Sequence, residues 1–536
     1  MTEVNIIERF LNKNFLISPD FLECYDGKDE TIMKAFDGKE GPLVLNKDLV
    51  FVLKNNDKLA EINWVEFDKS RATLEKGKEE KIYNTFLDIL SCRLSPECGR
   101  SLDNISNNGR KVEQEIVVES PGDIAGAIVT RNYIDEENKK KEVSHFVQYF
   151  RARYNTLKDV LLSRPELQGT LSINRVICKK EREGVSIIGM VFDKRKTKNG
   201  NLVITLEDLT GIVNILVNKG KEGLFSIAED LALDEIVGVI GTFSDGVIYA
   251  EKIYFPDVPM TNNVKRCSDD VKVAFISDIH VGSIYFLEKQ FLNFIGWLNN
   301  KDDLARNIKY LFIVGDLVEG IGVFPDQEKT LTIFDVKQQY KELARYLSLI
   351  RKDIQIIMCP GDHDALRLAH PQPAITKELS EDIVALPNVV LVTNPSMVNI
   401  HSSRTFPGFD ILLYHGHGYH YFIDNVESLR KGDTLENPRK IMKFLLQKRH
   451  LAPTHSSSVY VPDSKYDPLI IDKVPDVFVS GHLHRSDVGV YRNVITISCS
   501  CWQARTDFQI KVDNHPDPGT VPILNLKTRN VEILHF

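Results

Sequence analysis

The chain has 536 residues, of which 43% are hydrophobic and 26% charged, and its formal net charge at pH 7 is -8. This length predicts two to four domains with ample core. Because the net charge is negative, the protein surface as a whole cannot bind polyanions. Contact with nucleic acid therefore requires local basic patches or a partner. Because the sequence shows no transmembrane-length apolar run, signal-peptide pattern or CxxC pair, we expect a cytoplasmic protein with reduced thiols and no membrane contact.

The first 142 residues carry no recognisable chemistry. Apolar side chains at helical spacing in residues 1–70 predict a small helical N-terminal module. Residues 71–142 are poorly patterned and end in the charge run DEENKKKE, so we expect a linker that is partly disordered.

Residues 143–258 are expected to form a helix followed by a β-barrel. Phe146, Phe150, Leu157 and Leu161 follow helical spacing, and the helix should end before Arg164-Pro165. Five short strands with a helical insert near residues 219–231 predict an OB-type barrel. Its basic loop, residues 194–198, favours a nucleic-acid surface, whereas the scarcity of aromatic residues on the strands favours a protein-docking platform; the sequence leaves both open.

Residues 270–536 predict an α/β domain in which apolar strands alternate with helices. Five of these strands are followed at once by Asp or His, and thirteen of the fourteen histidines lie beyond residue 275. Ligands bind at the carboxyl ends of strands in open α/β sheets. The residues delivered there are Asp278, His280, Asp316, Asp362, His415, His482 and His484.

Three carboxylates and four imidazoles are enough for two divalent ions that share one bridging carboxylate. The absence of a cysteine from this set argues against a structural zinc site. We therefore expect a metal-dependent hydrolytic centre in this half of the chain.

The motifs DIHVGS, GDLVEG, GDHD, YHGH and GHLH, in this order, resemble the calcineurin-like metallophosphoesterase family. The runs GDHDALRLAHPQPAI, WQARTDFQ and PDPGTVPILNL extend the resemblance to the small subunits of archaeal family-D DNA polymerases, over about residues 145–536. The resemblance implies a phosphoesterase β-sandwich flanked by helices and preceded by an OB domain. It also implies a 3′-to-5′ exonuclease that proofreads DNA replication.

The resemblance also implies a role for each residue of the centre. Asp278, His280, Asp316 and His484 would hold one ion, and Asp316, Asp362, His415 and His482 the other. His363 would face the scissile phosphate as the catalytic acid or charge stabiliser. Manganese is the ion expected first, with zinc, iron or magnesium as alternatives. The implied partners are a large catalytic polymerase subunit and DNA with a 3′ end.

Two positions depart from the family pattern. Asp362 stands where these proteins usually have Asn, which adds a negative charge to the centre. His417 and His420 are additional histidines after the fourth strand, expected either to contact substrate or to be solvated.

The alternatives are a non-catalytic scaffold subunit of a DNA polymerase and a repair nuclease on the same phosphoesterase fold. A further interpretation concerns residues 429–450, which carry seven basic and two acidic side chains, a net of 7 - 2 = +5. This excess favours contacts of Lys448 and Arg449 with the DNA backbone, against the alternative of a solvated amphipathic helix.

Overall fold

The computed structural model separates the chain into two compact units, residues 1–109 and residues 110–536. The structure describes residues 16–17, 44–45, 116–117, 126–133, 140–179, 182–260, 263–300, 302–463, 465–511 and 513–536. In the first unit these residues form β1 (Leu16–Ile17) and β2 (Val44–Leu45), which pair in parallel. The helical module expected at residues 1–70 otherwise lies outside the described residues. Within the described residues, no helix is both long and apolar enough to cross a membrane.

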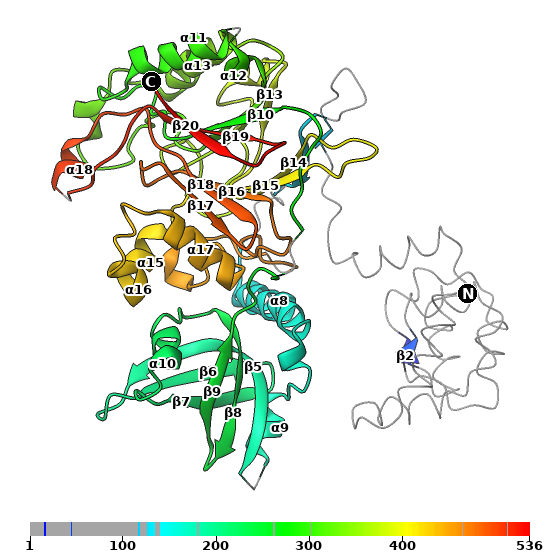
Figure 1. The fold of residues 1–536 in the computed structure, drawn as a ribbon. Helices are drawn as coiled ribbons and strands as arrows, with labels where there is room; N and C mark the ends of the chain where they lie inside the picture. The colour runs from blue at the N-terminus through cyan, green and yellow to red at the C-terminus, as the bar shows by residue number, and fades with distance from the viewer. Residues whose placement is uncertain are drawn as a thin grey trace, which may run out of the picture. The chain divides into compact units, whose positions relative to one another are not determined.

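A long helix and a closed barrel form the N-terminal part of the second unit (Figure 1). The elements are α8 (Val143–Leu162), η2 (Pro165–Leu167), α9 (Ile173–Ile177), β5 (Glu183–Lys196), β6 (Leu202–Asp208), β7 (Gly211–Val217), α10 (Glu222–Glu229), β8 (Ile236–Ser244) and β9 (Val247–Tyr254). The barrel closes in the order β5-β6-β7-β9-β8. This confirms the predicted five strands and helical insert. On α8, Leu157 and Leu161 are buried as expected, but Phe146 and Phe150 are only half-buried, and the buried face continues through Tyr149 and Arg153.

Two mixed sheets form the rest of the unit. The first has the order β13-β12-β11-β10-β19-β20, and the second β17-β18-β16-β15-β14-β4-β3. The strands of the first are β10 (Lys272–Ile276), β11 (Ile308–Val314), β12 (Gln355–Cys359), β13 (Val389–Leu391), β19 (Thr520–Asn525) and β20 (Val531–His535). Those of the second are β3 (Ile116–Val117), β4 (Ile128–Arg131), β14 (Ser396–Ile400), β15 (Phe409–Leu413), β16 (Val477–Ser480), β17 (Asp487–Tyr491) and β18 (Val494–Ser498). The strand β4 corrects the predicted linker, because it pairs with β14 inside the sheet.

The two sheets pack face to face around a shared apolar core, to which Phe275 and Phe312 contribute from one sheet and Ile411 and Val479 from the other. Helices α11 (Glu288–Leu298) and α13 (Val336–Ser348) cover the outer face of the first sheet. Helices α15 (Tyr419–Asn425) and α17 (Arg439–Lys448) cover that of the second (Figure 1). The shorter helices are α12 (Asp303–Arg306), η3 (Gln327–Thr330), α14 (Glu381–Val384), α16 (Glu427–Arg430), η4 (His455–Ser457) and α18 (Asp507–Lys511). The result is a β-sandwich with helices on both sides.

A buried polar cluster fastens α8 to the sandwich. The Arg153 guanidinium lies 2.7 Å from Asp467, and both side chains are at most 1% exposed. Tyr149 donates a hydrogen bond to the same carboxylate, and His450 Nε2 lies 2.8 Å from it. The backbone N–H of Ala452 donates to His450 Nδ1, so that His450 is held as a neutral ring that donates from Nε2. Burial, followed by the charge of Arg153, lowers the pKa of His450 to about 4.

This cluster predicts acid lability. The folded pKa of His450 is depressed, so the unfolded chain binds a proton that the folded chain excludes between pH 6.5 and pH 4. Stability should fall over this window by about 3 kcal/mol on account of His450. We expect His450→Gln to shrink the difference in urea-unfolding free energy between pH 7 and pH 4.5, as followed by tryptophan fluorescence. His145→Gln, on the surface of α8, is the matched control. A His450→Gln variant with wild-type pH dependence would contradict this account.

Candidate metal centre

The ends of five strands from both sheets bring the predicted ligands together. Asp278 and His280 follow β10, Asp316 follows β11, and Asp362 follows β12. Because β10, β11 and β12 are parallel, their loops leave the same edge of the first sheet. The second sheet delivers His415 after β15 and the pair His482 and His484 after β16, again from parallel strands. All seven predicted ligands therefore meet where the two sheets end.

The backbone at this edge is strained. Five of the seven residues adopt positive φ angles between 49° and 73°, a region that non-glycine residues enter at a cost of about 1–3 kcal/mol each. They are Asp278, His280, Asp316, His482 and His484. Such strain persists only where the surrounding structure enforces it, and it clusters at functional sites. The strained backbone therefore indicates a functional site at this edge, independently of the residue types found there.

Glycines next to the ligands leave no room for other side chains. A Cβ atom at Gly361 would collide with Asp316 Oδ1 and lie 2.9 Å from His415 Nε2. At Gly481 it would lie 2.6 Å from Asp278 Oδ2. The glycines therefore allow the backbone to approach the carboxylates and imidazoles closely.

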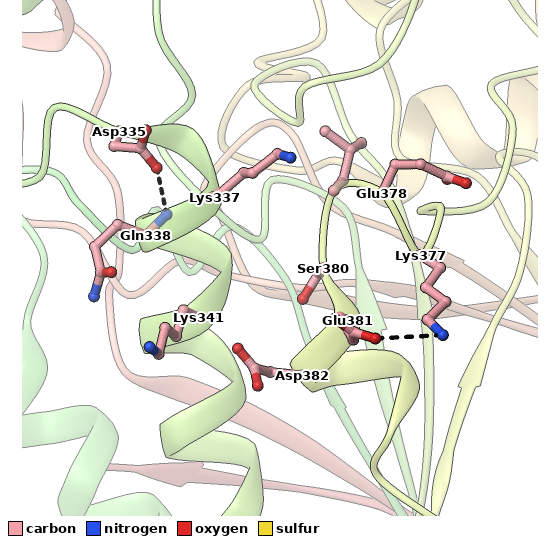
Figure 2. Close-up of a pocket in the computed structure, with 10 residues that line it drawn as sticks. Asp335, Lys337, Gln338, Lys341, Lys377, Glu378, Ser380, Glu381 and Asp382 are labelled. Carbon is pink, nitrogen blue, oxygen red and sulfur yellow. Dashed lines mark hydrogen bonds and ion pairs between the residues drawn. The ribbon is translucent and has the colours of Figure 1, made fainter.

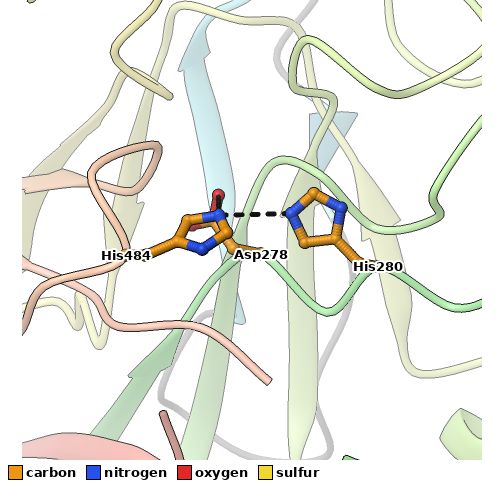
Figure 3. A group of neighbouring side chains, drawn as sticks. All are labelled: Asp278, His280 and His484. Atoms are coloured by element: carbon orange, nitrogen blue, oxygen red, sulfur yellow. Dashed lines mark hydrogen bonds and ion pairs between the residues drawn. The ribbon is translucent and has the colours of Figure 1, made fainter. Parts of the chain in front are cut away.

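The first group of ligands consists of Asp278, His280 and His484 (Figure 3). The Nε2 atoms of the two histidines are 3.3 Å apart, and Asp278 Oδ1 lies 3.3 Å from His484 Nε2. Asp278 is wholly buried and also accepts hydrogen bonds from Ser277 and from the backbone of His482. Three ligand atoms thus converge from two loops, the one after β10 and the one after β16.

The second group consists of Asp362, His415 and His482. His415 Nδ1 donates to the Val314 carbonyl at 2.8 Å, so its Nε2 lone pair faces the centre. His482 Nδ1 lies 3.0 Å from Asp362 Oδ2. This group matches the expected ligands of the second ion, apart from the shared Asp316.

Asp316 lies between the two groups. Its Oδ2 atom is 3.7 Å from His280 Nε2 and 3.4 Å from His415 Nε2. Burial on its own would raise the pKa of Asp316, but the charges of His415 and His363 outweigh it and hold the pKa well below its usual range. Asp316 is thus kept ionised between the two groups.

Several buried polar atoms of the centre have no hydrogen-bond partner within the described residues. They are Asp362 Oδ1, His415 Nε2 and His482 Nε2. Buried atoms of this kind are normally satisfied, and these three belong to one ligand group. An oxygen and two imidazole nitrogens are ligands that divalent ions accept, so the residues present fit a metal.

His363 lies beside the centre and is oriented by Glu319, a residue that the sequence analysis missed. His363 Nδ1 donates to the Glu319 carbonyl at 2.9 Å, which leaves Nε2 free. The Glu319 carboxylate lies 3.0 Å from His280 Nδ1. Burial opposes the charge on His363, but Asp316 and Glu319 raise its pKa overall. The only sequence signal for Glu319 was its place three residues after Asp316 in GDLVEG.

Asp362, which stands where the family usually has Asn, forms an ion pair with His417, one of the two additional histidines. His417 Nδ1 lies 3.0 Å from Asp362 Oδ2, the same oxygen that His482 approaches. The added carboxylate charge is thus faced by one of the two added histidines. His420 stacks edge-on against His482 instead, and burial lowers its pKa to about 4.

Lys448 and Arg449 do not lie on the surface, which argues against the predicted DNA contacts. Lys448 is 2% exposed and forms a 2.7 Å ion pair with Glu235, with its ammonium 3.6 Å from the Phe255 ring centroid. Arg449 is 3% exposed and donates to the carbonyls of Ile471 and Asp472. Both side chains join α17 to its neighbours, so we do not propose them as a DNA-binding pair.

Two pockets lie in the sandwich half of the described chain. The larger, about 490 Å³, lies between α13 and α14 and is lined by both acidic and basic side chains (Figure 2). It contains none of the predicted ligands. The smaller, about 280 Å³, includes Asp362 and His363 in its wall and therefore adjoins the candidate metal centre.

Comparisons with known proteins cover both parts of this unit. Residues 273–488 match the B-subunit family of DNA polymerases alpha and epsilon, and residues 185–246 match the OB-fold nucleic acid binding domain. A DNA polymerase II small subunit from Methanothermobacter thermautotrophicus is 39% identical over 390 residues, which cover 72% of this chain and 78% of that protein. The Halobacterium salinarum small subunit is 37% identical, over 78% of each chain. That of Pyrococcus furiosus is 38% identical, over 74% of this chain and 64% of the relative.

Proposed function

The chain belongs to the family of archaeal DNA polymerase II small subunits, and from this premise we propose that it carries a metal-dependent 3′-to-5′ exonuclease. The observation that carries the proposal is the complete ligand set, seven side chains from five strand ends with Asp316 between two groups. Family membership implies a large catalytic subunit as partner. In this assignment the nuclease removes mismatched nucleotides that the polymerase leaves at a 3′ end.

The proposed chemistry needs two divalent ions. Asp278, His280, Asp316 and His484 would hold one, and Asp316, Asp362, His415 and His482 would hold the other. Such ions lower the pKa of water and neutralise the charge that gathers on the phosphoryl oxygens. Manganese is the first ion to test, followed by zinc, iron and magnesium.

The protein's own residues position the substrate and move the proton. His363 is fixed at Nδ1 by the Glu319 carbonyl, so Nε2 is the atom that can donate to the departing oxygen. Its raised pKa keeps it protonated to a higher pH than a free histidine. The Glu319 carboxylate also contacts His280 Nδ1. Glu319 therefore orients both His363, the proposed acid, and His280, a proposed metal ligand.

The direct test is the degradation of 5′-labelled single-stranded and 3′-mismatched DNA by the purified chain with manganese, with and without EDTA. We expect stepwise shortening from the 3′ end that EDTA abolishes. The same assay with Asp303→Ala, which removes an exposed carboxylate on α12, controls for unspecific loss of charge. Absence of degradation with every one of the four ions would contradict the proposal.

A non-catalytic scaffold is the second candidate, favoured by the closed barrel, which adds a separate folded surface to the sandwich. The OB-fold match supports contact with DNA or with the large subunit through this barrel. Two of its expected basic residues have other partners. Lys194 donates to the carbonyls of Glu229 and Leu231, and Lys196 pairs with the Glu229 carboxylate. The intact ligand set argues against a purely structural role.

A further inference from the structure

The smaller pocket beside His363 has an apolar wall that the proposed chemistry does not use. Besides Asp362 and His363, its lining includes Ile321, Val323 and Leu368. These three side chains are 40–49% exposed, and so is the neighbouring Phe324 at 40%. The Phe324 ring meets the His363 ring edge-on at 6.2 Å between centroids. One aromatic and three aliphatic side chains are therefore partly exposed next to His363.

The loop that carries Ile321, Val323 and Phe324 is held in place by hydrogen bonds to Gln327. The backbone N–H of Val323 donates to Gln327, whose side-chain amide donates in turn to the Glu319 carbonyl. Gly320 accepts no side chain, because a Cβ there would collide with the His363 carbonyl oxygen. Gln327 is 1% exposed. The hydrogen bonds of Gln327 thus fix the backbone that carries Ile321, Val323 and Phe324, and these three side chains are partly exposed.

The lining indicates the kind of ligand. Of the ten residues that line this pocket, none is lysine or arginine, and the charged ones are Asp362, His363 and Asp364. Apart from His363 and the ions proposed for the adjoining centre, a phosphate meets no cation there, whereas an uncharged planar ring can pack against Phe324 and the aliphatic wall. The volume of about 280 Å³ is near the lower end of small-molecule sites, about 300 Å³.

We propose that this pocket receives the base of the 3′-terminal nucleotide, stacked on Phe324, and so selects single-stranded or unpaired 3′ ends. This proposal rests on the proposed nuclease function, because the terminal base belongs to the nucleotide whose scissile phosphate would face His363. A partner protein in this position would cover the acid. A paired terminal base is already stacked in its duplex and has to leave it before it can enter. Stacking tolerates all four bases, as removal of any mismatched nucleotide requires.

The test compares two substrates and two variants of the full chain. The substrates are a single-stranded oligonucleotide with a natural 3′ nucleotide and the same oligonucleotide ending in a stable abasic analogue. We expect Phe324→Ala to reduce kcat/KM about tenfold on the natural end, a typical loss for a base-stacking residue, and to leave the abasic end unaffected. Phe334→Ala, which removes another exposed aromatic outside the pocket, should match the wild type on both.

A binding measurement without catalysis separates the two proposals. In EDTA, 2-aminopurine at the 3′ terminus should lose fluorescence on the wild-type chain and keep it on Phe324→Ala. If the wild type cleaves neither substrate, the nuclease proposal fails. If it cleaves both equally well and Phe324→Ala changes neither the rates nor the fluorescence, the nuclease stands and the base pocket is overturned.

Discussion

Asp316→Ala is expected to lose metal and nuclease activity together. Asp316 is the one ligand that lies between both groups, 3.7 Å from His280 and 3.4 Å from His415, so its removal opens both sites at once. The metal contribution to such reactions is several kcal/mol, which corresponds to a rate loss of more than about a thousandfold. Metal content by mass spectrometry, measured beside the exonuclease rate, checks both parts of this expectation.

Asp316→Asn is the second variant of this experiment, because Asp316 also accepts a hydrogen bond from the backbone of His363. The amide keeps an oxygen for that bond and removes the charge. We expect it to fold as the wild type does, by circular dichroism, and to bind metal weakly. Asp303→Ala should retain both metal and activity. A folded Asp316→Asn chain with two full metal equivalents would show that Asp316 does not bridge the ions.

His363→Ala should separate chemistry from metal binding. It is expected to lose about 10²–10⁴-fold in exonuclease rate, the usual contribution of a positioned acid, while it still binds two ions. His363 lies close to His280 and Asp316, in a group whose ligand atoms are all within 4.8 Å, so the metal measurement is what distinguishes an acid from a ligand. Loss of one metal equivalent would make His363 a ligand.

His363→Asn controls for the anchoring role of the ring. The asparagine amide keeps a donor for the Glu319 carbonyl, to which His363 Nδ1 donates in the wild type, but it supplies no proton. We expect it to be as slow as His363→Ala and to retain both ions. His145→Ala on α8 is the matched histidine control. Recovery of most activity in His363→Asn would mean that the residue only positions the loop.

The strand ends could be predicted from the sequence because each ligand directly follows a short apolar run. Asp278 after KVAFIS and Asp316 after YLFIV are local patterns, and parallel pairing then brings them to one edge. The barrel could also be predicted from local patterns, because its strands are bounded by turn residues such as Asp245 and Gly246, both at positive φ. Local sequence therefore defined most of the elements that carry the candidate site.

Contacts between distant segments could not be predicted. The burial of Lys448 depends on Glu235, which the barrel supplies, and a local count of charges contains no sign of it. The strand β4 was missed because a run of four residues is too short to carry a clear strand pattern. The pairing of His417 with Asp362 joins two loops that follow different sheets. In each case the sequence shows the residue type, and only the fold supplies its partner.

We propose above all that this chain holds two ions bridged by Asp316. The most direct measurement is anomalous scattering from crystals of the chain grown with manganese. Two peaks about 3.5–4 Å apart are expected, one next to Asp278, His280 and His484 and the other next to Asp362, His415 and His482, with Asp316 contacting both. A single peak, or none at this edge of the sandwich under saturating manganese, would contradict the account.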